Sequence, residues 1–191
     1  MPEEITNQWE KWIKDVEEVS RFELPRYIFK SLTKPPKTHN LYLHTFCDGG
    51  KDAWGICIYV RFQVAKDKFE SQLIYSSSRV APTKNLLSTP KKELNAIVLG
   101  CKKAISIAKA IEIPTKNLYI HTDSLVCMHW ICKEKDQLKT YVRNRIQKIQ
   151  EAELKILYTP GKENPADLTT KPKPTHTYIN NKFWINGPEY L

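Results

Sequence analysis

The sequence has no long hydrophobic run, no targeting peptide and no paired-cysteine motif, and each absence excludes a class of protein. No run of about eighteen apolar residues occurs, so a membrane-spanning helix is not expected. The acidic start, Met1 to Glu4, is unlike a signal or transit peptide, and we expect an intracellular protein, cytoplasmic or nuclear. The five cysteines contain no Cys-x-x-Cys pair, which predicts buried free thiols in a reducing compartment and no zinc site.

Positive charge is in excess, and it is unevenly distributed along the chain. Of the 30 basic and 21 acidic residues, seven of each sign lie in residues 1–40, which leaves 23 basic and 14 acidic residues in 41–191. A basic domain favours a polyanionic partner, because each neutralised phosphate releases counterions. Charge alone is weak evidence, since many basic proteins bind no polyanion.

The chain is predicted to have three parts. Residues 5–20 form an amphipathic helix, because Trp9, Trp12, Ile13 and Val16 recur at helical spacing. Residues 24–37 contain three prolines and are predicted as a linker. We therefore expect an N-terminal helix and linker (1–39), a main domain (40–170) and a C-terminal tail (171–191). The two tryptophans should bury against the main domain or bind a partner.

The main domain is predicted as an α/β fold with a mixed five-stranded sheet flanked by helices. Its expected strands lie at 41–48, 53–63, 69–78, 118–123 and 154–159. A long helix should begin at an N-cap Thr89 followed by Pro90. Later helices are expected at 124–133, capped by Ser124, at 138–152, and after Asn164-Pro165, where a short helix carries Asp167. A strand, a helix and a further strand usually form a right-handed parallel crossover, which gives the sheet its mixed character.

Four carboxylates are predicted to meet at one edge of this sheet. Asp48 and Asp123 end two neighbouring strands, and ligands in open α/β sheets bind beyond strand carboxyl ends. Glu93 lies in the first turn of the long helix and Asp167 in the short last helix. Clustered carboxylates repel one another and require compensation. Two Mg²⁺ ions, bound through carboxylate oxygens, would supply it and would support phosphoryl hydrolysis. The alternative is that these acids are ordinary surface and capping residues.

Several motifs together resemble the ribonuclease H domain in polymerase polyproteins of Bel/Pao-type LTR retroelements. The matching stretches are FCDGGKDAWGICIYVR (46–61), SSSRVAP (76–82), TPKKELNAIVLG (89–100), HTDSLVCMHWI (121–131), KTYVRNRIQKIQ (139–150) and TPGKENPADL (159–168). The tail FWINGPEYL (183–191) resembles the end of that region, and residues 9–26 resemble the segment joining reverse transcriptase to ribonuclease H. Each motif alone is weak, but the set is specific.

The resemblance implies a ribonuclease H-like fold and an activity. It places a catalytic, metal-binding acidic tetrad on Asp48, Glu93, Asp123 and Asp167, with two Mg²⁺ or Mn²⁺ ions as cofactors. It implies cleavage of the RNA strand of an RNA–DNA hybrid, leaving a 3′-hydroxyl and a 5′-phosphate, with recognition through hybrid shape and 2′-hydroxyl groups. It also implies a reverse transcriptase, or a host protein, as a partner of the N-terminal helix.

The chain departs from cellular ribonucleases H in the loop after the fifth strand. Those enzymes carry a mobile histidine there, whereas residues 159–163 contain none, and Lys162 is the nearest replacement. A lysine holds phosphate as a point charge but titrates far above neutral pH. The other candidate substrate-binding residues are Gly49, Gly50, Ser78 and Arg79. A basic ridge on the DNA backbone or a solvated helix face is the alternative for Lys139, Arg143 and Arg145. Arg145 is also a candidate for a structural ion pair.

Competing functions remain open from the sequence. The first is a hybrid-specific endoribonuclease derived from a retroelement polymerase. The second is a host-adopted domain that binds nucleic acid or protein with little catalysis. A DNA endonuclease or integrase of the same superfold is a third, although those proteins usually carry three acids at other spacings. His44, His121 and His129 are predicted to be packing residues rather than ligands.

Overall fold

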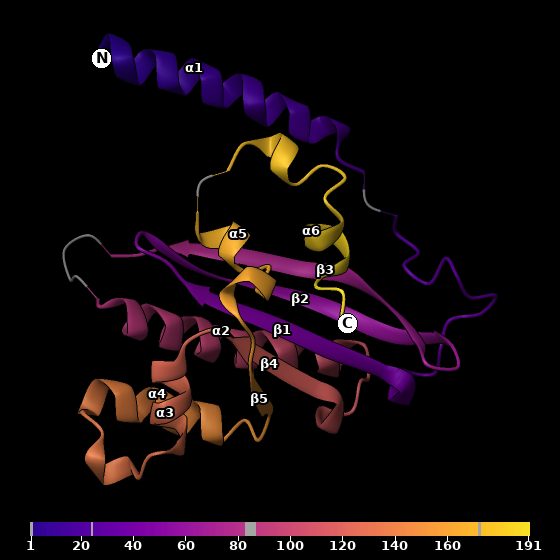
Figure 1. Cartoon of the computed structure of the whole chain (residues 1–191), viewed down its shortest axis with the longest axis vertical. Helices are drawn as coiled ribbons and strands as arrows, with labels where there is room; N and C mark the ends of the chain where they lie inside the picture. The colour runs from indigo at the N-terminus through magenta and orange to yellow at the C-terminus, as the bar shows by residue number, and fades with distance from the viewer. Residues whose placement is uncertain (1, 24, 83–86, 172) are drawn as a thin grey trace.

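The computed structural model describes residues 2–23, 25–82, 87–171 and 173–191. Within these residues the chain forms five strands and six α-helices, with short 3-10 turns in several of the connections (Figure 1). The strands are β1 Leu41–Gly49, β2 Ala53–Ala65, β3 Lys68–Val80, β4 Leu118–Thr122 and β5 Lys155–Tyr158. The helices are α1 Glu3–Glu17, α2 Thr89–Ala110, α3 Leu125–Cys132, α4 Thr140–Gln150, α5 Asp167–Thr170 and α6 Lys182–Asn186. Within the described residues, no helix is both long and apolar enough to cross a membrane.

The five strands form one mixed sheet in the order β3-β2-β1-β4-β5. β1 pairs antiparallel with β2, and β2 antiparallel with β3, whereas β4 is parallel to both β1 and β5. The predicted mixed five-stranded sheet is therefore confirmed. In the parallel pair, Cys47 lies opposite Thr122, so the residues that follow them, Asp48 within β1 and Asp123 just after β4, lie at the same end of the sheet.

The face of the sheet beneath α2 holds the larger hydrophobic core. Alternate residues of β1 and β2, such as Leu43 and Ile58, contribute to it, and Leu94 and Ile97 from α2 pack against them. All four side chains are fully buried. Each buried aliphatic side chain of this size stabilises the fold by about 1.5–3 kcal/mol, so this face holds α2 firmly against the sheet.

The opposite face of the sheet is covered by the C-terminal segment, as Figure 1 shows for α5 and α6. Phe46 and Tyr59 from the sheet form a second core with Trp184 and Leu191. The Tyr59 hydroxyl donates to the carbonyl of Trp184 at 2.8 Å. Residues 171–191, predicted only as a tail, thus contain a helix and cover the sheet.

Most element boundaries agree with the sequence prediction to within two residues. The capping role of Ser124 is confirmed, because its side chain accepts a hydrogen bond from the Cys127 amide at 3.2 Å. The predicted N-cap Thr89 is wrong by one position, since Ser88 has the extended backbone of the N-cap. Four cysteines are buried free thiols, but Cys132 is exposed, contrary to the prediction.

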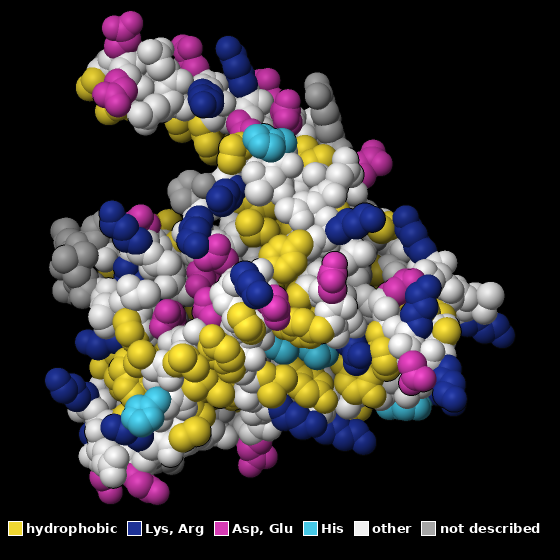
Figure 2. Space-filling model, viewed as in Figure 1, with side chains coloured by type: hydrophobic (Ala, Val, Ile, Leu, Met, Phe, Trp, Pro, Cys, Tyr) yellow, Lys and Arg dark blue, Asp and Glu magenta, His cyan; other side chains and the backbone are white. Residues whose placement is uncertain are grey.

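Helix α1 stands away from the body along most of its length (Figure 2). Trp9 and Trp12 stack on one another at 5.0 Å and are each 53% exposed, so burial against the main domain, one of the two predicted alternatives, is wrong, and partner binding stays a prediction. Near its C-terminal end α1 is bonded to the body, because both carboxylate oxygens of Asp15 accept from the Thr175 amide. Beyond α1, the segment at 28–32 returns to the core, where Phe29 meets Phe62 edge to face at 4.9 Å.

Two truncations should separate these two parts of the N-terminal segment. Removing residues 1–21 takes away the exposed helix and its hydrogen bonds to Thr175 but none of the described core residues, so we expect the melting temperature to change by less than about 2 °C. Removing residues 1–38 also takes away Phe29 and its neighbours from the core, and we expect a fall of about 5 °C or more, corresponding to roughly 2 kcal/mol. Thermal unfolding measures both. Phe29→Ala in the full chain is the matched control and should reproduce most of the larger fall; equal losses for the two truncations would contradict the assignment.

Candidate active site

The first part of the site is the junction between the end of β1 and the start of α2. Gly49 is buried there, and a Cβ atom at this position would collide with the backbone nitrogen of Glu93 and the carbonyl carbon of Lys92. Glycine is therefore required for the close approach of strand and helix. The approach places Asp48, the penultimate residue of β1, near Glu93 in the first turn of α2. The predicted phosphate contact of Gly49 stays a prediction, since packing already accounts for this glycine.

The second part is the end of β4, where the chain turns into α3. Asp123 follows the strand directly, and Ser124 uses its hydroxyl both to cap α3 and to donate to the carboxylate of Glu93. The Asp123 Oδ1 atom is buried and has no hydrogen-bond partner among the described residues. A buried carboxylate oxygen without a donor is costly unless a cation compensates it.

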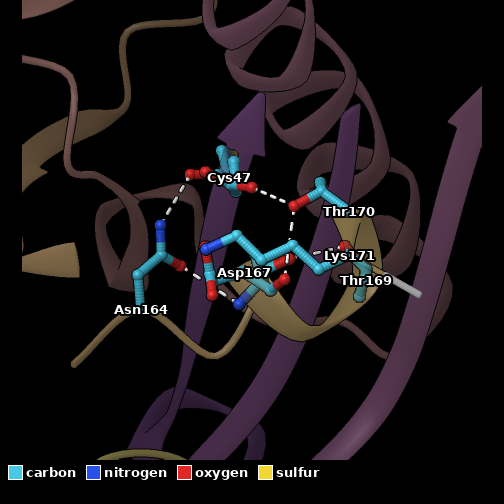
Figure 3. Close-up of polar contacts among 8 residues, drawn as sticks. Cys47, Asn164, Asp167, Thr169, Thr170 and Lys171 are labelled. Carbon is cyan, nitrogen blue, oxygen red and sulfur yellow. Dashed lines mark hydrogen bonds and ion pairs between the residues drawn. The ribbon is translucent and has the colours of Figure 1, made fainter. Parts of the chain in front are cut away.

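The third part is the segment that enters and forms α5 (Figure 3). The Asn164 amide donates to the carbonyl of Cys47 at 3.0 Å, and Asn164 Oδ1 accepts from the Ala166 amide at 3.1 Å. The Thr170 hydroxyl donates to the carboxylate of Asp48. Asp167 forms an ion pair of 2.5 Å with Lys171 one turn later. These bonds attach α5 to the end of β1 and bring Asp167 to the other acids.

The carboxylates influence one another electrostatically. Burial raises the pKa of Asp48, and the charges of Asp123 and Asp167 raise it further, against the lowering effect of the Thr170 hydrogen bond. Burial likewise raises the pKa of Glu93, with smaller contributions from Asp123 and Asp48. Burial is also the main cause of the raised pKa of Asp123; hydrogen bonds from its own backbone amide and from the Asn164 side chain lower that pKa, and the charge of Asp167 raises it. The hydrogen bond to Asp167, and then the charges of the acids, raise the pKa of Lys171, which partly compensates the cluster.

The four acids thus lie close together at one end of the sheet, but their side chains do not form a metal-coordination shell in this structure. In the part of the chain that is described, no three His, Cys, Asp or Glu side chains are arranged to hold a metal ion. Asp48, Glu93 and Asp167 are bonded instead to Thr170, Ser124 and Lys171. The donor set nevertheless suits a hard divalent cation, because all four residues offer oxygen ligands and Asp123 Oδ1 has no hydrogen-bond partner in the described part of the chain.

The candidate substrate-binding residues lie around this neighbourhood on different surfaces. Ser78 is exposed on β3 and lines a surface cavity of about 530 Å³ together with Thr169 and Lys171, beside the acids. Arg79, the next residue, faces the other side of the sheet, toward α2 and α4. Gly50 lies against Thr170, where a Cβ atom would come within 3.2 Å of the threonine side chain.

The loop after β5 borders the site at Asp123. A Cβ atom on Gly161 would lie 3.1 Å from Asp123 Oδ2, and the next residue, Lys162, is exposed. The loop therefore lies beside Asp123 at Gly161. A role for Lys162 on phosphate remains a prediction.

The three histidines that were predicted to pack divide into a buried pair and an exposed residue. His44 Nδ1 lies 3.0 Å from His121 Nε2, and His121 Nδ1 lies 2.9 Å from the Thr159 hydroxyl. Burial lowers the pKa of His44 to about 3 and that of His121 to about 4, which keeps both rings neutral near pH 7. Their predicted packing role is confirmed. His129 is exposed, so its predicted packing role is wrong.

Two residues of the site were missed from the sequence. Thr170 orients Asp48 and Lys171 pairs with Asp167, and both follow the matched stretch 159–168 directly. Spacing would have found Lys171, because a lysine four residues after an aspartate lies on the same face of a helix. No local signal indicates Thr170, because its partner is 122 positions away in the sequence.

Comparison with known proteins identifies a family. The sequence model of the family described as Pao retrotransposon-like RNaseH-like domain matches residues 1–124, about two thirds of the chain. The match includes Asp48, Glu93 and Asp123 and ends before Asp167. No curated protein sequence matches the chain.

Solved structures with similar coordinates share little sequence with the chain. The N-terminal RNase H domain of a Mycobacterium tuberculosis protein is 11% identical, with a TM-score of 0.46, over 65% of this chain and 86% of that one. LC11-RNase H1, isolated from compost and solved in complex with RNA/DNA hybrid, is 13% identical, with a TM-score of 0.45, over 68% and 92%. Foamy viral protease-reverse transcriptase in complex with double-stranded DNA is 15% identical, with a TM-score of 0.43, over 83% of this chain and 26% of that one. These identities are too low for individual residues to be transferred.

Replacing Asp123 with asparagine should stabilise the metal-free protein near neutral pH. Because the folded-state pKa of Asp123 is raised, its ionised form destabilises the fold above that pKa, and the penalty vanishes as the pH falls toward the unfolded value near 4. We therefore expect Asp123→Asn to raise the melting temperature by about 2–4 °C at pH 7, roughly 1 kcal/mol, and by less at pH 4. Thermal unfolding in a chelating buffer measures this. Asp136→Asn, at an exposed position, is the control, and a lower melting temperature for Asp123→Asn at pH 7 would contradict the account.

Proposed function

The chain belongs to the family of Pao retrotransposon-like RNaseH-like domains, and from this premise we propose that it is a ribonuclease H that cleaves the RNA strand of RNA–DNA hybrids. The family and the mixed sheet support a nuclease-type function on nucleic acid. The finer proposal is that Asp48, Glu93, Asp123 and Asp167 hold two Mg²⁺ or Mn²⁺ ions and carry the catalysis.

The observation that carries this proposal is the meeting of the four acids at one end of the sheet. They come from β1, α2, the end of β4 and α5, and three of them raise the pKa of another member of the set. Repulsion between neighbouring carboxylates destabilises a fold. Clustered carboxylates with shifted pKa values are therefore typical of functional sites, where the negative charge binds a ligand or takes part in catalysis. When bound, the metal ions would polarise the phosphate and lower the pKa of a water molecule.

The residues around the acids have supporting roles in the proposal. The Thr170 hydroxyl holds the carboxylate of Asp48, and the Ser124 hydroxyl holds that of Glu93, so each keeps its orientation without a charged partner. Lys171 neutralises Asp167 in the free protein. Ser78, exposed near the acids, can donate to the 2′-hydroxyl and phosphate groups of the RNA strand, while Gly50 and Arg79 are further candidate contacts.

Helix α1 is proposed as a partner-binding element rather than part of the catalytic unit. Its exposed tryptophans form an apolar surface, which is typical of protein interaction sites. The proposed partner is a reverse transcriptase or a host protein.

A nucleic-acid-binding module without catalysis is the second candidate function. Two observations favour it. Asp48, Glu93 and Asp167 are bonded to protein donors, and the described residues contain no group of three side chains arranged to coordinate a metal ion. Cleavage distinguishes the two functions, since both predict binding to the hybrid and only the first predicts shortened RNA.

Cleavage of a labelled hybrid in Mg²⁺ should depend on each carboxylate of the tetrad. We expect Asp48→Asn to reduce the rate by about a thousandfold or more while the protein stays folded, because the amide keeps the shape and loses the charge. Gel analysis of hybrid, duplex RNA and duplex DNA gives rate and specificity, and Mg²⁺ should raise the melting temperature of the wild type but not of the variant. Glu112→Gln, at an exposed position beyond α2, is the matched control. Equal cleavage by Asp48→Asn and the wild type would refute the tetrad.

The loop after β5 should act on phosphate through Lys162. Lys162→Ala is expected to weaken hybrid binding about threefold at low salt, with the difference shrinking as salt rises, because screening removes the contribution of the charge. Lys162→His should add a dependence of the rate on pH between about 6 and 7 that the parent lacks. Binding isotherms over a salt series and pH–rate profiles measure these effects. If Lys162→Ala changes neither affinity nor rate at low salt, the loop is only a connector.

A further inference from the structure

A cationic groove lies between α2 and α4, on the side of the sheet away from α5. It encloses a cavity of about 540 Å³. Its walls are matching helical stripes, Asn95, Val98, Leu99 and Lys102 on α2 and Tyr141, Asn144, Arg145 and Lys148 on α4. Both stripes follow the spacing of one helix face, so the groove runs along α2 for about 10 Å at 1.5 Å per residue.

The groove carries positive charge without compensation. Arg79, Lys102, Arg145 and Lys148 line it, and none of the described residues that line it is acidic. The Lys91 amine lies 5.1 Å from the Tyr141 ring centre and adds a fifth cation at the rim. A concave surface of one sign concentrates ligands of the opposite sign.

One of these cations is held in a fixed orientation. The Arg145 guanidinium stacks 3.4 Å above the Tyr141 ring, and its Nε donates to Asn95 Oδ1 at 2.6 Å. Its Nη1 donates to the carbonyl of Tyr141 at 3.1 Å, while Nη2 has no protein acceptor among the described residues. A structural role for Arg145, one of the alternatives from the sequence, is thus observed. The fixed guanidinium presents its remaining donors at little entropic cost, which suits a phosphate oxygen.

The groove adjoins the acidic cluster through the first turns of α2 and the end of the sheet. Trp54 and Arg79, which line it, are paired across β2 and β3, and Trp54 is paired with Gly49 beside Asp48. Asn95 lies two residues after Glu93, on the other side of α2. One extended polyanion that passes the first turn of α2 could therefore contact both the acidic cluster and the groove.

We infer that the groove between α2 and α4 binds phosphates of the nucleic-acid substrate outside the cleavage site. The inference rests on the proposed function, because the substrate that occupies the acids supplies the strand. The length of the groove corresponds to about three steps of 3.4 Å along one strand of a duplex. Lys102 and Lys148, at the far end of the stripes, contact the part of the backbone most distant from the acids.

The test uses the full chain in a chelating buffer and measures binding of a labelled hybrid of two helical turns. The double variant Lys102→Ala/Lys148→Ala should bind about tenfold more weakly at low salt, and its log–log salt slope should be shallower by about two, as expected for two lost phosphate contacts. The matched control, Lys109→Ala/Lys116→Ala, removes the same charge at exposed positions outside the groove and should change both quantities far less. Equal effects of the two double variants would overturn the inference.

Lysine footprinting of the wild type gives a second readout that needs no mutation. At saturation, the long hybrid should protect Lys102 and Lys148 from acetylation, with Lys109 and Lys116 as unprotected internal controls. A hybrid shorter than one turn, saturating the same protein, should protect the groove lysines less. Modification of Lys102 and Lys148 at the rate of the controls, or equal protection by the short hybrid, would refute a contact continuous with the cleavage site.

Failure of this inference can be told from failure of the proposed function. Cleavage of the long hybrid by the wild type in Mg²⁺ tests the proposed function separately. If the wild type cleaves and the groove variant binds like the control variant, the groove inference alone is wrong. If the wild type does not cleave but the groove variant loses binding, the groove inference holds and the nuclease proposal is wrong.

Discussion

The structure depends above all on the close approach of the end of β1 to the first turn of α2. This approach is possible because Gly49 has no side chain to separate the two backbones. It aligns Asp48 with Glu93, and the parallel pairing of β1 with β4 adds Asp123 at the same edge. A larger residue at position 49 would move the helix that also forms one wall of the cationic groove, so the acids and the groove share one constraint.

Two separate parts of the chain form bonds to the carboxylates at this end of the sheet. Thr170 and Lys171 from one part and Ser124 from the other each satisfy one carboxylate, whereas Asp123 Oδ1 is buried without a hydrogen-bond partner among the described residues. Burial contributes most to the raised pKa values, and mutual repulsion adds to it. Burying several carboxylates close together lowers the stability of the fold. Such clusters are expected at sites that bind cations and phosphate, and not at positions that only support the fold.

The two faces of the sheet contribute differently to the core and to the candidate site. The face beneath α2 carries the large aliphatic core and positions Glu93. The other face is closed by the C-terminal segment, whose Asn164 and Thr170 bond to β1 next to Asp48. The C-terminal residues are therefore part of the site architecture.

The sequence by itself determined the elements, their order and the placement of the four acids at strand ends and near the starts of helices, because hydrophobic periodicity, caps and strand-end positions are local signals. Ser124 as a cap and the mixed sheet follow from such signals, and the motif set indicated the family. Tertiary structure alone decided what lies far apart in sequence: the bond from Thr170 to Asp48, the packing of Gly49 on Glu93 and the covering of the sheet by α6. It also decided against burial of Trp9 and Trp12, since amphipathic spacing states that a helix has an apolar face but not which surface covers it. Likewise, periodicity in the sequence indicates which residues share one face of α2 and which share one face of α4. Only the packing of the two helices side by side forms a positively charged groove between these faces.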